Sequence, residues 1–342
     1  MKLPIWPPYP PMEALSVGEI PEDPGWQYEP KWDGFRALSF RDLTEVEIQS
    51  KSSKSLTRYF PELVAELLKL KARRFVLDGE IVIPIKKSFV FDALLQRIHP
   101  AASRIEKPSL ETPAKLIVFD LLVDEKGRDL SKWPLQKRRP LLEAFAKKYF
   151  PRGSSLSLSP ATTNLKTIGQ WAKKAGNSLD GIIAKQLDLD YRSGERDGMQ
   201  KIKTAKTADC VVGGFRYATK GHRIGSLLLG LYNDEGLLDH VGFIAVGKSF
   251  GTPELTKTLE KIIGPPGFTG DAPGGPSRWS TKRSTEWQPL KTKLVVEVKY
   301  DHFTGGRFRH GTKFLRWRPD KSPKQCTIKQ VKRESGLPLL LL

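Results

Sequence analysis

The pattern of apolar residues changes near Thr207, and this change constrains the fold more than any other feature of the sequence. Before it, short runs of β-branched and aromatic residues alternate with segments whose apolar residues recur at helical spacing, as in residues 60–70. After it, short apolar runs follow one another with turn residues between them, as in residues 233–236. Because 342 residues exceed the usual size of one core, we expect an α+β domain followed by a small β-barrel.

The two parts differ in the elements that we expect. Prolines without periodicity make residues 1–25 an extended segment that lies on the first domain. The first domain is expected to contain strands at residues 26–30, 35–40, 46–50, 75–84 and 115–122 and helices at residues 60–70, 135–150 and 165–175. The barrel is expected to contain strands at residues 210–217, 225–233, 237–246 and 294–303.

The net charge of +19 indicates a polyanionic partner rather than a merely solvated surface, because clustered Lys and Arg side chains neutralise phosphates and release counterions. The basic residues are denser after Thr207, which favours a barrel of the oligonucleotide-binding (OB) type. Cys210 and Cys326 lie far apart and outside any CxxC spacing, so we expect no cysteine zinc module and no disulfide framework, which fits a reducing cytoplasm. No run approaches the roughly 20 apolar residues of a membrane-spanning helix, and the closing LPLLLL is expected to be a docking tail or a frayed end.

A candidate nucleophile lies in the segment EPKWDGFR, where Lys31 precedes an Asp-Gly turn. A lysine that reacts covalently must lie among cations or in a dry pocket, because either environment lowers its pKa. The pattern KxDG alone occurs by chance in roughly one protein in ten to twenty. A solvated loop lysine is therefore the simpler interpretation of this motif when it is taken alone.

Suitable partners for such a lysine follow in order along the chain. Residues 78–80 (DGE) end an apolar run, which predicts a carboxylate at a strand terminus that faces a cleft. Phe119 ends another apolar run and offers an aromatic face on which a base could stack. Residues 180–185 (DGIIAK) form a turn that leads into a strand, and Lys201 and Lys203 alternate so that both point the same way. Each piece alone is more often structural, and the ordered series carries the inference.

This series resembles the covalent nucleotidyltransferases, which comprise polynucleotide ligases and mRNA-capping enzymes. It is most similar to the two-domain bacterial ATP-dependent DNA ligases related to the ligase module of non-homologous end joining. The resemblance runs from Trp26 to Thr327 through the segments EPKWDGFR, SKSSKSLTRYFPEL, VLDGEIV, KLIVFDLL, DGIIAK, MQKIK and FLRWRPDK. It implies an α+β adenylation domain at residues 1–206 and an OB-fold domain at residues 207–342, joined by a hinge near residues 204–207.

The resemblance also implies roles at the nucleotide. Lys31 would attack the α-phosphorus of ATP and hold AMP as a phosphoramidate. Arg36 and Glu80 would contact the ribose, Phe119 would stack on adenine, and Glu29 would lie near the edge of the base.

Further residues would handle the phosphates and a divalent ion. Asp180, with Glu80, would bind the metal, although relatives have Glu at the position of Asp180. The lysines at the α-phosphate would be Lys185, Lys201 and Lys203, whose positive field would favour the neutral Lys31 amine. Lys51 stands where many relatives have an Arg that contacts the nucleotide or the 5′-phosphate of the nick. The residues that orient the pyrophosphate leaving group would be Arg316, Arg318, Asp320 and Lys321.

We therefore expect an ATP-dependent DNA ligase that uses Mg²⁺ or Mn²⁺ and seals nicked duplex DNA through a lysyl-AMP intermediate. We also expect a cytoplasmic, nucleoid-associated monomer without membrane contact that works with end-joining or repair proteins. An RNA ligase or an mRNA-capping enzyme is the alternative within the resemblance, and an NAD-dependent ligase is disfavoured because its zinc-finger cysteines are missing. A non-catalytic nick-binding protein would require a degenerate site, and the departures from the pattern are Asp180 and Lys51.

Overall fold

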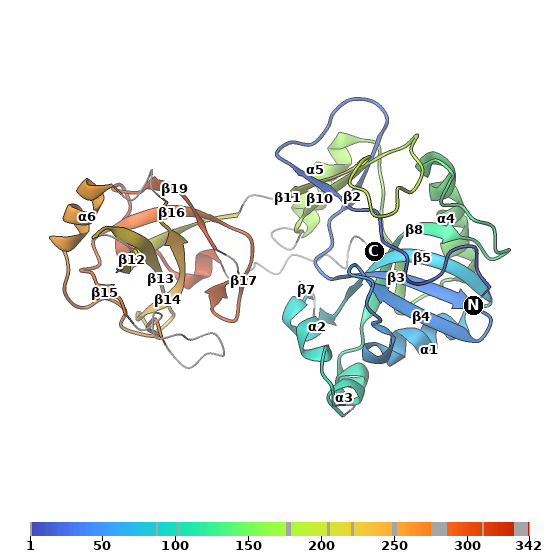
Figure 1. Ribbon diagram of the computed structural model, residues 1–342, viewed down its shortest axis with the longest axis horizontal. Helices are drawn as coiled ribbons and strands as arrows, with labels where there is room; N and C mark the ends of the chain where they lie inside the picture. The colour runs from blue at the N-terminus through green and yellow to red at the C-terminus, as the bar shows by residue number, and fades with distance from the viewer. Residues whose placement is uncertain are drawn as a thin grey trace. The chain divides into compact units, whose positions relative to one another are not determined.

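The computed structural model describes residues 2–86, 88–101, 103–175, 179–203, 206–219, 222–247, 252–274, 286–309, 311–331 and 341. The chain divides into two compact units, one within residues 1–204 and one within residues 205–333, and Leu341 belongs to the first (Figure 1). Of the expected hinge, residues 204 and 205 lie outside the described part, and residues 206 and 207 begin a strand. Every described helix is too short or too polar to span a bilayer.

A five-stranded sheet forms the centre of the first unit (Figure 1). Its order is β4 (Glu45–Ser50), β3 (Phe35–Asp42), β5 (Arg74–Val82), β8 (Lys115–Val123) and β9 (Leu156–Leu158). Neighbours are antiparallel except β8 and β9, which run parallel. Alternation along β3 sends Ala37 to one face and Leu38 and Phe40 to the other. Both faces are buried, so most residues of the inner strands β5 and β8 are apolar.

Different segments cover the two faces of this sheet. Helices α1 (Pro61–Lys69) and α4 (Leu135–Tyr149) pack on one face. The N-terminal segment packs on the other face through Leu3, Ile5 and Met12. This contact confirms that the proline-rich start lies on the first domain. The connection between β5 and β8 contains β6 (Pro84–Ile85), β7 (Ser88–Phe89), α2 (Phe91–Arg97) and α3 (Ser103–Glu111).

A second sheet of the first unit carries the other motif segments. Its order is β1 (Leu15–Val17), β11 (Met199–Lys203), β10 (Gly181–Gln186) and β2 (Trp26–Pro30). Strand β10 runs antiparallel to both β11 and β2. Helix α5 (Leu165–Ala175) covers this sheet through Ile168 and Trp171.

The second unit is a small barrel around one apolar core. Its sheet order is β14 (Leu238–Ala245), β13 (Ile224–Tyr232), β12 (Lys206–Tyr217), β16 (Val295–Tyr300) and β19 (Lys313–Trp317). A bridge between Ile244 and Thr312 joins the two ends of this sheet and closes it. Shorter elements are α6 (Pro253–Glu260), β15 (Gln288–Pro289), β17 (Phe303–Thr304), β18 (Arg307–Phe308) and the 3₁₀ turns Pro323–Gln325 and Ile328–Gln330. Cys210 and Cys326 are both free and buried.

The expected strands and helices are confirmed, with two corrections of strand length. The DGE segment and Phe119 do not end their strands, because β5 continues to Val82 and β8 to Val123. The acids that suggested strand ends are buried but paired: Asp120 lies 2.8 Å from an Nη of Arg138. A charge that is satisfied in this way does not interrupt a buried strand. Helices α2, α3 and α6 were not predicted.

Candidate active site

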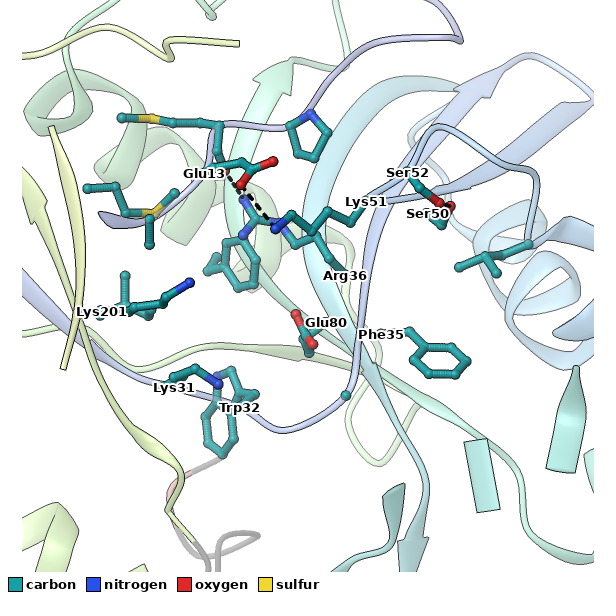
Figure 2. Close-up of a pocket in the computed structure, with 18 of the residues that line it drawn as sticks. Glu13, Lys31, Trp32, Phe35, Arg36, Ser50, Lys51, Ser52, Glu80 and Lys201 are labelled. Atoms are coloured by element: carbon teal, nitrogen blue, oxygen red, sulfur yellow. Dashed lines mark hydrogen bonds and ion pairs between the residues drawn. The ribbon is translucent and has the colours of Figure 1, made fainter. Parts of the chain in front are cut away.

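A cavity of about 950 Å³ lies in the first unit and is lined from both of its sheets (Figure 2). Strands β2, β10 and β11 contribute from one sheet, and β3, β5 and β8 contribute from the other. The N-terminal segment adds residues 11–14, and the loop after β4 adds Lys51 and Ser52. The cavity therefore collects most of the motif segments that are scattered over the sequence.

Two glycines allow the motif loops to approach their neighbouring strands. A Cβ on Gly34 would lie 2.2 Å from the carbonyl oxygen of Ile81. A Cβ on Gly181 would lie 2.1 Å from the carbonyl oxygen of Ile202, and its φ of +146° is also unfavourable for other residues. Between them, the Lys31 amide donates to the Gly181 carbonyl at 2.9 Å. The KWDG and DGIIAK segments therefore meet, although about 150 residues separate them.

The Lys31 ammonium forms an ion pair with Asp180, whose side chain is 2 % exposed. Burial opposes the charge on Lys31, but the attraction of Asp180, with smaller contributions from Glu80 and Asp33, outweighs it and raises the pKa. The expectation that cations favour the neutral Lys31 amine is therefore wrong for this arrangement. Sequence spacing could not reveal which acid would contact the lysine.

Glu80 lies opposite Arg36 in the register of β5 and β3 and lines the cavity (Figure 2). Burial raises the pKa of its carboxyl to about 7, although the positive charges of Arg36 and Lys31 act against this. Near neutral pH, Glu80 is therefore present in both protonation states. Either state can hydrogen-bond a hydroxyl group, which fits its expected contact with a ribose.

The aromatic ring expected to hold a base has two cations beside it. The Cζ of Arg36 lies 4.5 Å and the Nζ of Lys185 lies 4.6 Å from the centroid of the Phe119 ring. Lys185 also donates to both carboxylate oxygens of Glu29 at 2.9 Å. The structure thus brings Lys185 together with the residues expected at the base. Its expected place at the α-phosphate, beside Lys201, stays a prediction.

Arg36 is held by residues that sequence reasoning did not assign. Its Nε and Nη2 donate to the two oxygens of Asp78 at 2.6 Å each. The Tyr191 hydroxyl donates to Asp78 at 2.6 Å and accepts from the Met12 amide at 3.0 Å. Asp78 could be suspected from the DGE motif, whereas Tyr191 and Met12 carry no local signal.

Of the remaining predicted lysines, Lys51 and Lys201 line the cavity, whereas Lys203 is not among its lining residues. Burial, followed by the charges of nearby lysines, lowers the pKa of Lys201. Lys51 lies 3.0 Å from Glu13 (Figure 2). Glu13 also lies 3.2 Å from Arg196. Lys203 is exposed at the end of β11, two residues beyond Lys201. Glu13 and Arg196 were not predicted, because their role depends on contacts between distant segments.

Comparisons with known proteins identify the family. Residues 13–203 match the sequence family described as the ATP dependent DNA ligase domain, and residues 220–321 match the ATP dependent DNA ligase C terminal region. This chain belongs to the ATP-dependent DNA ligases. It is 43 % identical to DNA ligase C2 of Mycolicibacterium smegmatis and 41 % identical to DNA ligase C of Mycobacterium tuberculosis. Each alignment covers 97 % of this ligase and 96 % of the relative.

The fold of the ligase agrees with a solved structure of the family. A Lig E DNA ligase matches with a TM-score of 0.52 at 15 % identity, over 90 % of this chain and 99 % of that one. The expected fold class, an α+β adenylation domain followed by an OB-fold barrel, is therefore confirmed. The resemblance to ATP-dependent DNA ligases is confirmed as well.

The C-terminal motif of the ligase lies in the second unit. Its charged residues pair with acids of the same unit: Arg316 lies 2.7 Å from Glu297, and Arg318 lies 2.8 Å from Asp320. The pKa of Asp320 is lowered to about 2, chiefly by its hydrogen bond with Arg318. Lys321 pairs with Asp209 at 2.5 Å. The structure thus brings the four motif residues together in one ion-pair network.

Proposed function

We propose that this ligase forms its covalent intermediate on Lys31. The observation that supports the proposal most strongly is that one cavity holds Lys31, whose ammonium pairs with Asp180, together with Glu80 and the ring of Phe119. In the first step, the neutral Lys31 Nζ attacks the α-phosphorus of ATP. A P–N bond forms, the bond to the bridging oxygen of pyrophosphate breaks, and pyrophosphate leaves. Because the Lys31 pKa is raised, the Nζ must lose a proton before it attacks.

The later steps use the same cavity. The 5′-phosphate of a nick displaces Lys31 from the AMP phosphorus, and the 3′-hydroxyl then displaces AMP and closes the phosphodiester bond. Lys51 and Lys201 lie on the cavity wall and would contact these phosphates. Arg318 and Lys321, in the second domain, would orient pyrophosphate in the first step.

The residues around Lys31 fit a divalent cation. Carboxylate oxygens of Asp33 and Asp180 lie within 4.8 Å of each other. Glu80 also acts on Lys31 electrostatically. Oxygen ligands of this kind suit Mg²⁺ or Mn²⁺. When bound there, the ion would supply positive charge at the α-phosphate.

The biological setting is also part of the proposal. We assign residues 1–206 to the adenylation domain and residues 207–342 to the OB-fold domain. A substrate of nicked duplex DNA agrees with the net charge of +19, and binding to it would place the enzyme at the nucleoid. The ligase is 32 % identical, over 88 % of its length, to the Mycobacterium tuberculosis multifunctional non-homologous end joining DNA repair protein LigD. That match supports a role in repair or end joining, beside proteins of that pathway. We further propose that the ligase acts as a monomer.

Labelling with α-³²P ATP and magnesium, followed by a denaturing gel, tests the nucleophile. We expect the wild-type enzyme to take up label and Lys31→Ala to take up none. Equal labelling of both proteins would exclude Lys31 as the nucleophile. Labelling by GTP would favour a capping enzyme, and sealing of nicked RNA rather than nicked DNA would favour an RNA ligase.

A further inference from the structure

Two acids and one cation form a row across three strands of the second unit. The cation belongs to the C-terminal motif, and the acids lie on the two neighbouring strands. Asp209 on β12 is the register partner of Glu297 on β16, and Glu297 is the partner of Arg316 on β19. Register partners project their side chains from the same face of a sheet. Like charges placed directly opposite each other repel, so Asp209 and Glu297 together require cations nearby.

Two further motif residues supply these cations. Nη1 of Arg318 lies 2.9 Å from Oδ1 of Asp209 and 3.7 Å from Oε2 of Glu297. Nζ of Lys321 lies 2.5 Å from Oδ2 of Asp209. Each oxygen of the Asp209 carboxylate thus binds a different motif residue. The Arg318 amide also donates to the Val295 carbonyl at 2.8 Å, which anchors the motif backbone to β16.

Asp209 is itself fixed in place. The residue is 8 % exposed. Its amide donates to Oε1 of Gln330 at 3.0 Å, and its carbonyl accepts from Nε2 of Gln330 at 3.1 Å. A buried carboxylate on a clamped backbone can hold long, flexible cationic side chains in one conformation.

Other acids of the network are less suited to this task. The Asp320 side chain, which also binds Arg318, is 63 % exposed, so solvent screens its interaction. Glu297 binds Arg316, whose side chain is 66 % exposed. Among the described residues, Asp209 is the only acid that forms ion pairs with both Arg318 and Lys321.

We propose that Asp209 is a positioning residue for the first step of ligation: it holds Arg318 and Lys321 in the geometry in which they orient the pyrophosphate of ATP. The inference rests on the proposed function of these two residues. Asp209 acts through them and takes no part in the chemistry. Preorganised cations stabilise a transition state without reorganising during the reaction. Loss of the Asp209 carboxylate should therefore slow the adenylation step, in which these cations act.

The decisive variant is Asp209→Asn, which removes the charge but keeps the size of the side chain and the backbone contacts with Gln330. Formation of labelled Lys31-AMP is measured in a single turnover at saturating ATP, and sealing of a pre-adenylated nick is measured separately. We expect the first rate to fall about tenfold to hundredfold. Sealing should stay within about twofold, because no pyrophosphate takes part in it.

A matched control removes a different carboxylate of the same barrel. Asp239 accepts from the Asn233 side chain at 3.1 Å and from the Asp271 amide at 2.9 Å, and it forms no ion pair with any of the described residues. Asp239→Asn should leave both rates within about twofold of the wild type. Thermal unfolding of both variants monitors the fold. A parallel loss of both steps in Asp209→Asn, together with a lowered Tm, would show a purely structural role and overturn the proposal.

A double variant and the corresponding triple variant separate the proposal from its premise. In an Arg318→Ala/Lys321→Ala background, Asp209→Asn should slow adenylation by less than about twofold more, because the residues it positions are gone. If this background adenylates Lys31 at the wild-type rate, the pyrophosphate role fails and the role of Asp209 fails with it. If the background is slow but Asp209→Asn alone is not, only the role of Asp209 fails. A faster Asp209→Asn enzyme would mean that Asp209 restrains the cations, which also contradicts positioning.

Discussion

At the scale of single residues, Asp180 determines the charge state of Lys31. The ion pair raises the pKa of the amine, and only the neutral amine can attack phosphorus. The adenylation rate should therefore rise with pH through the alkaline range. Any interaction that draws the Asp180 carboxylate away from Lys31 should lower the pKa and assist the attack.

Asp180→Asn tests this coupling without ATP. We expect the variant to lower the Lys31 pKa, so that Lys31 reacts several-fold faster with trinitrobenzenesulfonate at pH 8. Peptide mapping by mass spectrometry measures the modification, and the exposed Lys148 serves as an internal reference. Unchanged reactivity of Lys31 would contradict the proposed effect of Asp180.

The raised pKa of Glu80 predicts that this carboxyl lowers the stability of the fold at neutral and alkaline pH. Its folded pKa of about 7 exceeds the ordinary value of 4.5, so the folded state binds the proton more tightly than the unfolded chain does. Ionising Glu80 therefore destabilises the fold progressively as pH rises from about 4.5 to about 7. Glu80→Gln should be more stable than the wild type by about 3 kcal/mol at pH 8 and about equally stable at pH 4. Urea unfolding at both pH values measures the difference, and an equal gain at both would exclude titration as its cause.

At the scale of secondary-structure elements, the pairing of strands determines where the reactive groups lie. Strand β10 pairs with β2 so that Ile183 is opposite Glu29, and with β11 so that Gly181 is opposite Lys203. The motifs DGIIAK, EPKWDG and MQKIK are thereby fixed in one sheet. Changes in this pairing should affect adenylation even where no reactive side chain is altered.

Gly181→Ala tests the close approach of β10 and β11. The added Cβ would meet the Ile202 carbonyl oxygen at 2.1 Å, so the strands must separate. We expect a loss of about 2 to 4 kcal/mol of stability by urea unfolding, together with slower Lys31 adenylation. Gly169→Ala in α5 is the control, because nothing lies within 4 Å of its Cβ and alanine favours the helix by about 1 kcal/mol. A Gly181→Ala protein as stable as the wild type would contradict the close approach.

At the scale of the whole molecule, the net charge of +19 predicts that DNA binding depends strongly on salt. If the ligase neutralises about six phosphates, raising NaCl from about 50 to about 200 mM should weaken nick binding about 10³-fold. Fluorescence anisotropy with a labelled nicked duplex measures the affinity. Adenylation of Lys31 without DNA should change far less over the same range. An affinity that does not depend on salt would exclude phosphate contacts as the main source of binding.

The sequence predicted the features that depend on local order. Apolar periodicity indicated the strands and helices, because alternation and helical spacing reflect burial of one face. The change of pattern near Thr207 separated an α+β part from a barrel. The motif series identified Lys31, Glu80, Phe119 and Lys201 as residues of one site, and one cavity contains them all.

The tertiary structure decided the properties that depend on contacts between distant segments. It paired Lys31 with Asp180 and so raised the pKa that the sequence had suggested would fall. It placed Lys185 beside Glu29, and it buried Asp78 against Arg36 while the nearby Glu80 faces the cavity. The sequence by itself determined which residue types are present and which elements carry them. Strand register and burial decided which charges meet, because the energy of a charge depends on its neighbours and its exposure to water, and only the folded chain sets both.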